Sequence, residues 1–271
     1  MWWMFLFCLG EPIAMPAGHQ IHIEVQGEGK PLLLIPGLGV THHTWREVTP
    51  QLGDEFLVVM MDLRGTGGST DSHTPYTLDG LAEDAIAVMA ELGHASYAVV
   101  GLSLGSFVAQ RVAEKAPDRV EKLVLIASTL GGSDHVPPDG DVLTYFMNMN
   151  QLTPEQRVEQ GLRLALHPDY VASHPVEMEA MAAWSLAHPV NPQVLSKQAF
   201  AGATFVANPT AIKAETLLIH GAEDRIVPVA NARKLVAALA NAKLQVISPA
   251  GHACHIDAAE TVANSLLQFL K

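Results

Sequence analysis

A serine stands between two glycines directly after an apolar run. Ser103 lies in the segment VVGLSLGSFVAQ (99–110), with Gly101 two residues before it and Gly105 two residues after it. Glycine inside a helix or strand costs stability, so a pair at this spacing indicates that the backbone needs room. A strand, a sharp turn and a helix in this order would expose the hydroxyl at the helix N-terminus, where N–H groups and the helix dipole favour negative charge. The pattern predicts a nucleophilic serine. The competing interpretation is an ordinary helix start that Ser103 caps.

A serine nucleophile needs a base within hydrogen-bond reach, and that base needs a carboxylate to orient it. Asp224 follows the apolar run 216–221, and His252 follows the last such run, 243–248. The chain order Ser, Asp, His matches a sheet in which later strands carry the acid and the base. We therefore predict Ser103 as nucleophile, His252 as general base and Asp224 as the orienting acid.

Three neighbouring residues compete for these roles. Glu223 adjoins Asp224 and would point differently from the same turn, whereas Asp257 suits the first turn of the last helix. His255 could replace His252 only if the loop had a different shape.

Charge that develops on a carbonyl oxygen during attack needs hydrogen-bond donors. We expect one donor to be the backbone N–H of Leu104, directly after the serine. The second is expected from the loop PGLGV (36–40), where Leu38 stands between two glycines.

Strand-like and helix-like segments alternate along the chain. Short apolar runs typical of strands buried on both faces lie at 31–37, 56–62, 97–101, 122–128, 216–221 and 243–248. Helical spacing appears at 77–93, 103–117 and 257–271, and in the first of these Thr77 can cap the start and Gly93 the end. The alternation predicts a doubly wound, mostly parallel α/β sheet with ligands bound beyond the carboxyl ends of the strands.

No convincing strand appears between about 131 and 208, where helix-like pieces are broken by proline-rich turns. We interpret 131–208 as a helical lid inserted after a core strand, with the core formed by 18–130 and 209–271. Residues 1–17 form an N-terminal extension. Its segment MWWMFLFCLG is too short to span a bilayer and lacks the basic residues of a signal peptide. A misassigned start codon, with Met15 as the alternative start, or a loosely attached extension is favoured over an export signal.

Composition excludes several kinds of partner. The formal charge is −12 over 271 residues, which disfavours nucleic acid and anionic membrane surfaces. The two cysteines form no disulfide framework or zinc motif, and we expect reduced thiols in a cytoplasmic protein. Thirteen histidines include His19, His22, His42 and His43, but none has metal-site spacing. No metal and no cofactor is predicted.

The predicted lid is rich in methionine and aromatic residues, which can line an adaptable apolar pocket or simply pack its helices on the core. We name Met147 and Trp184 from the lid, and His42 beside the 36–40 loop, as candidates for contact with a substrate.

The segments GLSLG, HGAEDRIVP and AGH resemble the α/β-hydrolase superfamily, as does Asp62–Ser69 (DLRGTGGS). The resemblance covers nearly everything after Gly18. One departure is Pro36-Gly37, where relatives commonly have His-Gly. The resemblance implies a cofactor-independent serine hydrolase in which Arg64 braces the floor of the site.

The expected substrate is a carboxylic ester with a small to medium apolar acyl group. The same triad serves lactonases, thioesterases, C–C bond hydrolases and perhydrolases, so these remain alternatives. A receptor that binds its ligand on a hydrolase fold and turns it over slowly is an alternative of another class. The oligomeric state stays open.

Overall fold

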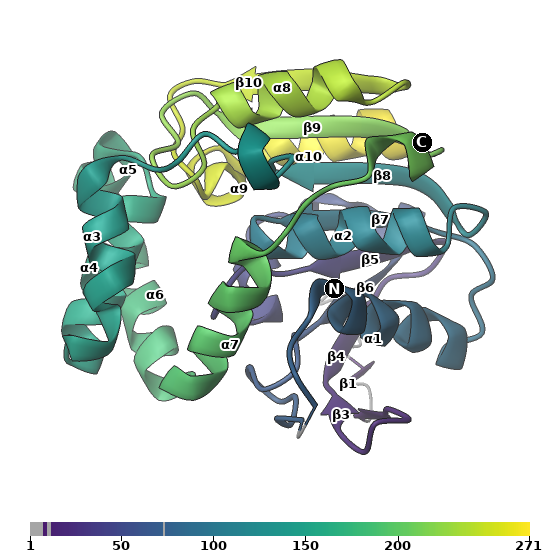
Figure 1. Ribbon diagram of the computed structural model, residues 1–271, viewed down its shortest axis with the longest axis horizontal. Coiled ribbons are helices and arrows are strands. Elements are labelled where there is room, and N and C mark those ends of the chain that lie inside the picture. Colours follow the sequence, from purple (N-terminus) through teal and green to yellow (C-terminus); the bar gives the residue numbers. More distant parts are fainter. Residues whose placement is uncertain (1–7, 10–11, 73) are drawn as a thin grey trace, which may run out of the picture.

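The apolar runs form one mixed, mostly parallel sheet in the computed structural model, which describes residues 8–9, 12–72 and 74–271 (Figure 1). Its eight strands lie in the order β1-β4-β6-β5-β7-β8-β9-β10, and only the pairings β1–β4 and β4–β6 are antiparallel. The strands are β1 (Cys8–Leu9), β4 (Ile23–Gln26), β5 (Lys30–Ile35), β6 (Phe56–Met61), β7 (Tyr97–Leu102), β8 (Val120–Ile126), β9 (Glu215–Gly221) and β10 (Ala242–Ile247). This confirms the predicted sheet.

Strand β5 shows why its sequence is apolar throughout. Side chains alternate between the two faces of a strand. Leu33 and Ile35 join the hydrophobic core on one face, and Leu32 and Leu34 join the core on the other. Both faces are covered, so neither can carry polar residues.

Helices cover the two faces. Residues of α1 (Leu78–Glu91), α2 (Leu104–Lys115) and α8 (Ala230–Ala238) pack into one core, and α10 (Ala259–Leu270) packs into the other. The short α9 (Cys254–Asp257) precedes α10. Helix α1 agrees with its prediction, since the Thr77 side chain accepts a hydrogen bond from the backbone N–H of Gly80, and Gly93 follows with a φ of 80°.

A helical insert separates β8 from β9. It contains α3 (Gly140–Asn148), α4 (Pro154–Ala165), α5 (Pro168–Ser173), α6 (Pro175–Ala187) and α7 (Pro192–Ala203). Figure 1 shows α3 to α6 standing beside the sheet, while α7 leads back to the core. An isolated bridge pairs Gly131 with Val206, where the chain leaves and rejoins the core.

Part of the predicted extension belongs to the fold. Cys8–Leu9 pairs with β4, and β2 (Ile13–Ala14) pairs with β3 (Gln20–Ile21). Met15, the alternative start, is only 5% exposed. The rest of segment 1–11 lies outside the described residues. Within the described part of the chain, every helix is too short or too polar to cross a membrane.

Candidate active site

Ser103 occupies a strained turn between β7 and α2. Its φ is 51°, a left-handed conformation that costs energy in residues with a side chain. A Cβ on Gly101 would lie 2.2 Å from the Gly105 carbonyl oxygen, and one on Gly105 would lie 2.3 Å from that of Ile35. Both glycines are therefore required by close backbone approach, which is the room their spacing predicted.

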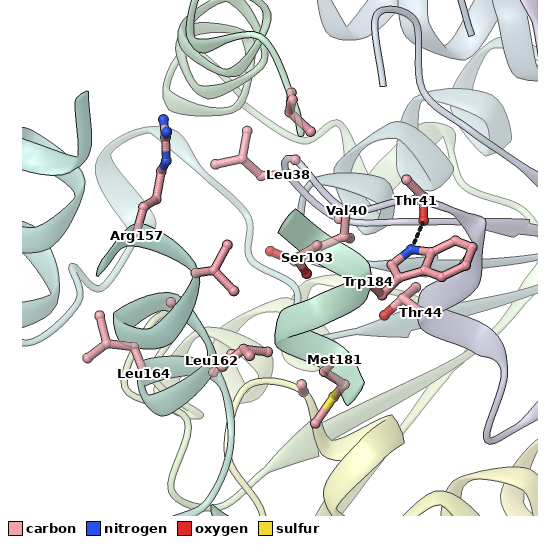
Figure 2. A pocket seen from close by; sticks show the side chains of 18 of the residues that line it. Leu38, Val40, Thr41, Thr44, Ser103, Arg157, Leu162, Leu164, Met181 and Trp184 are labelled. Carbon is pink, nitrogen blue, oxygen red and sulfur yellow. Dashed lines mark hydrogen bonds between the residues drawn. The ribbon is translucent and has the colours of Figure 1, made fainter. Parts of the chain in front are cut away.

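The turn is anchored on the neighbouring strand. The Ser103 N–H donates to the Ile126 carbonyl over 2.9 Å, at the end of β8. The Ser106 hydroxyl donates back to the Ser103 carbonyl over 2.6 Å. These contacts fix the backbone of the serine, while its side chain lines a cavity beside the carboxyl ends of the strands (Figure 2).

His252 and Asp224 form a buried pair. His252 Nδ1 lies 2.8 Å from Asp224 Oδ2, and His252 lines the same cavity as Ser103. The other carboxylate oxygen accepts the N–H groups of Ile226 and Val227 over 2.9 and 2.8 Å. Among the described residues no hydrogen bond joins the Ser103 hydroxyl to His252. In unliganded hydrolases this contact often tightens only when substrate is bound.

Asp224 is held as a carboxylate. Burial alone would raise its pKa, but the charge of His252 and hydrogen bonds from His220 and His252 outweigh burial and hold the pKa below the usual range. Because the carboxylate occupies Nδ1, Nε2 is the ring nitrogen of His252 that is left for the predicted role as general base.

His220 is a support that the sequence reasoning did not find. The buried His220 Nε2 lies 2.6 Å from the Val227 carbonyl and 3.2 Å from Asp224 Oδ2. Both of these atoms are acceptors, so Nε2 carries the ring proton and donates. His220 lies on β9, four residues before Asp224. This spacing between a histidine and an acid was the sequence signal that could have predicted the contact.

The competing residues have other partners. Glu223 accepts hydrogen bonds from the 248–250 turn. Asp257 accepts two backbone N–H groups from other loops. His255 is fully buried, and its Nε2 lies 2.8 Å from Thr44 Oγ1. None of the three contacts His252 through a hydrogen bond among the described residues.

The loop after β5 lies against the serine. A Cβ on Gly37 would lie 3.4 Å from Ser103 Cβ, so the adjacent Leu38 is beside the serine, and it lines the cavity. Leu104 is the first residue of α2, where helix N–H groups have no intrahelical acceptor. Their role as oxyanion donors stays a prediction.

Gln198 ties the insert to this loop and was not anticipated. Its side chain, fully buried on α7, accepts the Gly39 N–H over 3.1 Å and donates to Thr66 Oγ1 over 2.8 Å. The neighbouring Arg64 pairs with Asp84 over 2.7 Å, and its bracing role stays a prediction. Helical periodicity places Gln198 on α7 but gives no indication of its partner.

The cavity has a volume of about 570 Å³ and extends from Ser103 between the core and the insert. Most of its lining is apolar and comes from α3, α4 and α6 of the insert, together with the loops after β5 and β7. The insert residues include Tyr145, Phe146, Met149, Val158, Leu162, Leu164, Met181, Trp184 and Leu186. Such a space fits a small or medium apolar group.

The three predicted substrate contacts lie in different places. Trp184 lines the cavity and stacks on His43, with ring centroids 3.7 Å apart. Met147 is 74% exposed and does not line the cavity, because its helix turns another side inward. His42 is likewise absent from the lining, and its neighbour His43 lies there instead. Burial, followed by the charge of Arg46, lowers the pKa of His43 to about 4, so this ring is neutral near pH 7.

His42 belongs to a polar cluster outside the cavity. Ligand atoms of His22, His42 and Asp62 lie within 4.8 Å of one another, a grouping that could hold a metal ion. Nδ1 of His42 lies 2.9 Å from Asp62, and its Nε2 lies 3.0 Å from Glu24. Burial would lower the pKa of His42, but the two carboxylates raise it. The carboxylates of Asp62 and Glu24 thus favour the charged form of the His42 imidazole.

A sequence profile described as the alpha/beta hydrolase fold matches residues 30–259. The chain belongs to this family. It is 30% identical over 240 residues to RutD of Escherichia coli O127:H6, provisionally named a carbamate hydrolase, covering 87% of this chain and 89% of that one. It is also 30% identical over 245 residues to the poly(3-hydroxyalkanoate) depolymerase of Ectopseudomonas oleovorans, a match that covers 89% of this chain and 84% of the depolymerase.

Solved structures agree on the architecture. A hydrolase from Pseudomonas aeruginosa PA01 superposes with a TM-score of 0.83 at 26% identity, covering 96% of this chain and 97% of that one. The esterase EaEST from Exiguobacterium antarcticum also gives 0.83, at 20% identity, covering 98% and 99%. The first match supports a hydrolase, and the second shows the shared fold alone.

Proposed function

We propose that this α/β hydrolase is a cofactor-independent serine hydrolase that cleaves carboxylic esters of small to medium apolar acids through an acyl-enzyme. The observation that carries the proposal is the shared cavity, into which the strained Ser103 and the Asp224-anchored His252 both open. A strained serine and a carboxylate-oriented histidine have no packing benefit that would otherwise explain them.

The reaction follows from these positions. Ser103 Oγ attacks the acyl carbon while His252 Nε2 takes the hydroxyl proton, and Asp224 stabilises the imidazolium that forms. The N–H groups of Leu104 and Leu38 hold the oxyanion. Collapse breaks the ester bond, and the alcohol leaves with the proton from His252. Water then attacks the acyl-enzyme by the same route and releases the acid.

The apolar lining supports the substrate class. A cavity of about 570 Å³ with mostly carbon walls favours an uncharged chain of several carbons. The depolymerase relative is named for a polyester, and RutD is named for carbamates. Both names describe cleavage at an acyl carbon bonded to oxygen or nitrogen, which the proposed triad can perform.

The test is steady-state hydrolysis of p-nitrophenyl esters from acetate to palmitate, with p-nitrophenyl carbamate as an added substrate. Wild-type turnover should peak at a short or medium acyl chain and vanish in Ser103→Ala. Turnover that survives Ser103→Ala would contradict the proposed nucleophile. Near-background rates for every substrate would instead favour the lactone, C–C bond and slow-turnover receptor alternatives.

A further inference from the structure

Two threonine hydroxyls interrupt the apolar lining of the cavity. Thr41 precedes the 3₁₀ helix η1 (His42–Trp45), and Thr44 lies within it. Both residues line the same cavity as Ser103. Figure 2 shows them on one wall, on either side of the Trp184 ring, with Arg157 and Leu164 on the opposite side. The proposed ester hydrolysis gives neither hydroxyl a role.

The protonation of His255 decides what Thr44 can do. His255 is fully buried, with Nε2 2.8 Å from Thr44 Oγ1 and with no hydrogen-bond partner for Nδ1 among the described residues. Burial, reinforced by the charge of His252, lowers the pKa of His255 to about 3, so the ring is neutral and carries one proton. A proton on Nδ1 would be a buried donor without an acceptor, which folded proteins rarely contain. The proton therefore sits on Nε2 and is donated to Thr44.

A threonine hydroxyl has one hydrogen to donate and two lone pairs. Thr44 Oγ1 uses a lone pair on His255 and has no other hydrogen-bond partner in the described part of the chain. Its own hydrogen is thus uncommitted on the cavity wall. The Thr41 hydroxyl likewise accepts a hydrogen bond and keeps its own hydrogen, because Trp184 Nε1 lies 3.4 Å from its Oγ1 and an indole nitrogen can only donate.

We propose that Thr44, with Thr41 beside it, donates a hydrogen bond to a second oxygen atom of the substrate, one that is not part of the scissile ester. The ligand class is an ester whose acyl or alcohol chain carries an ether, ketone or ester oxygen at the position facing this wall. The proposal rests on the proposed function and deepens it. A purely hydrocarbon chain would leave a desolvated donor unpaired, so the site should discriminate against it.

The test replaces one methylene of the substrate by oxygen at successive positions. On the acyl side, p-nitrophenyl methoxyacetate is paired with the butanoate, and 3-methoxypropanoate with the pentanoate. On the alcohol side, 2-methoxyethyl butanoate is paired with butyl butanoate. Each ratio of kcat/KM is divided by the same ratio for hydroxide-catalysed hydrolysis, which removes the inductive effect of the oxygen.

Wild type should prefer the oxygen member of at least one pair by about tenfold, the value of one hydrogen bond. Thr44→Val should bring that ratio close to one, Thr44→Ser should keep it, and His255→Phe should lower it. Thr210→Val, an exposed threonine outside the cavity, is the matched control and should keep it. A wild-type ratio near one for every pair, or a preference that survives Thr44→Val, would overturn the proposal.

Binding separates this proposal from the proposed function. The dissociation constants of the same intact esters can be measured with Ser103→Ala and with Ser103→Ala combined with Thr44→Val, from the fluorescence of the protein's tryptophans. If esters are not turned over but an oxygen preference in binding depends on Thr44, the hydroxyl role stands and the proposed hydrolysis fails. If Ser103-dependent turnover shows no oxygen preference, the hydroxyl role fails alone.

Discussion

The loop edge of the sheet and the helical insert meet at one cavity but are built differently. On the sheet side, Asp224 and His220 are fully or nearly buried, and every oxygen of the carboxylate has a partner. On the insert side, the described side chains of α4 and α5 include none that is buried, and those of α6 include only Met181. The polar machinery is thus rigidly held, and the apolar wall is thinly packed.

This contrast suits a division of roles, in which the sheet side carries the chemistry and the insert selects the substrate. Groups that must move protons need fixed positions, which buried hydrogen bonds on strand ends provide. A wall made of half-buried helices can open locally at a lower free energy than the core. We expect changes on the sheet side to alter rate or stability strongly, and changes in the insert to alter which substrate fits.

The largest effect is expected from the acid. Asp224→Asn should lower kcat by about 10⁴-fold, because an amide at this position favours the wrong tautomer of His252. Glu223→Gln is the matched control in the same turn and should change kcat by no more than a few fold. Both are measured on the best p-nitrophenyl ester. A collapse in Glu223→Gln with a mild effect in Asp224→Asn would reverse the assignment of the acid.

Substitutions at two glycines test whether the turn at Ser103 and the helical insert differ in their contribution to stability. Gly105→Ala should reduce the free energy of unfolding by at least about 2 kcal/mol, since its Cβ would lie 2.3 Å from a backbone oxygen. A Cβ on Gly161 in α4 would lie 2.9 Å from the Tyr145 hydroxyl, which is a side-chain end and not backbone, and alanine gains helix propensity, so a change within about 1 kcal/mol is expected for Gly161→Ala. Urea unfolding measures both. If Gly105→Ala unfolds at the same urea concentration as the wild type, close backbone approach does not require glycine at this turn.

The burial of His255 predicts a pH effect on stability. Its pKa is lowered to about 3 in the folded protein, whereas the unfolded chain binds the proton near pH 6.5. The unfolded state thus binds more protons between these values, and stability falls as the pH falls through that window. Well below pH 6.5, the free energy of unfolding of the wild type should fall by about 1.4 kcal/mol more for each pH unit of acidification than that of His255→Gln. Equal slopes in urea unfolding between pH 6 and 4.5 would contradict it.

The smallest effect is expected from the insert wall. Met181 is buried and lines the cavity, so Met181→Ala should shift the preferred acyl chain toward longer esters by about three- to tenfold in relative kcat/KM. Met147→Ala removes the same side chain from an exposed position outside the cavity and should leave the preference unchanged. An equal shift in both variants would mean that Met181 acts through stability alone.

The sequence predicted the sheet well because β5 and its neighbours are buried on both faces, which produces continuous apolar runs. The turn at Ser103 was predictable because only glycine tolerates such close backbone approach. The cavity wall was not predictable. Periodicity places Met147 and Trp184 on helices but does not say which side of each helix faces the core. His220 and Gln198 were missed because their partners lie on other elements.

The most direct test of the central claim is covalent labelling of the nucleophile. The protein is treated with diethyl p-nitrophenyl phosphate, and the peptide that carries the added diethylphosphoryl group is identified by mass spectrometry. We predict one group per chain, on Ser103, released together with one equivalent of p-nitrophenol, and much slower labelling in Asp224→Asn. Stoichiometric labelling at another residue, or full ester turnover by a protein that cannot be labelled, would contradict the assignment of Ser103.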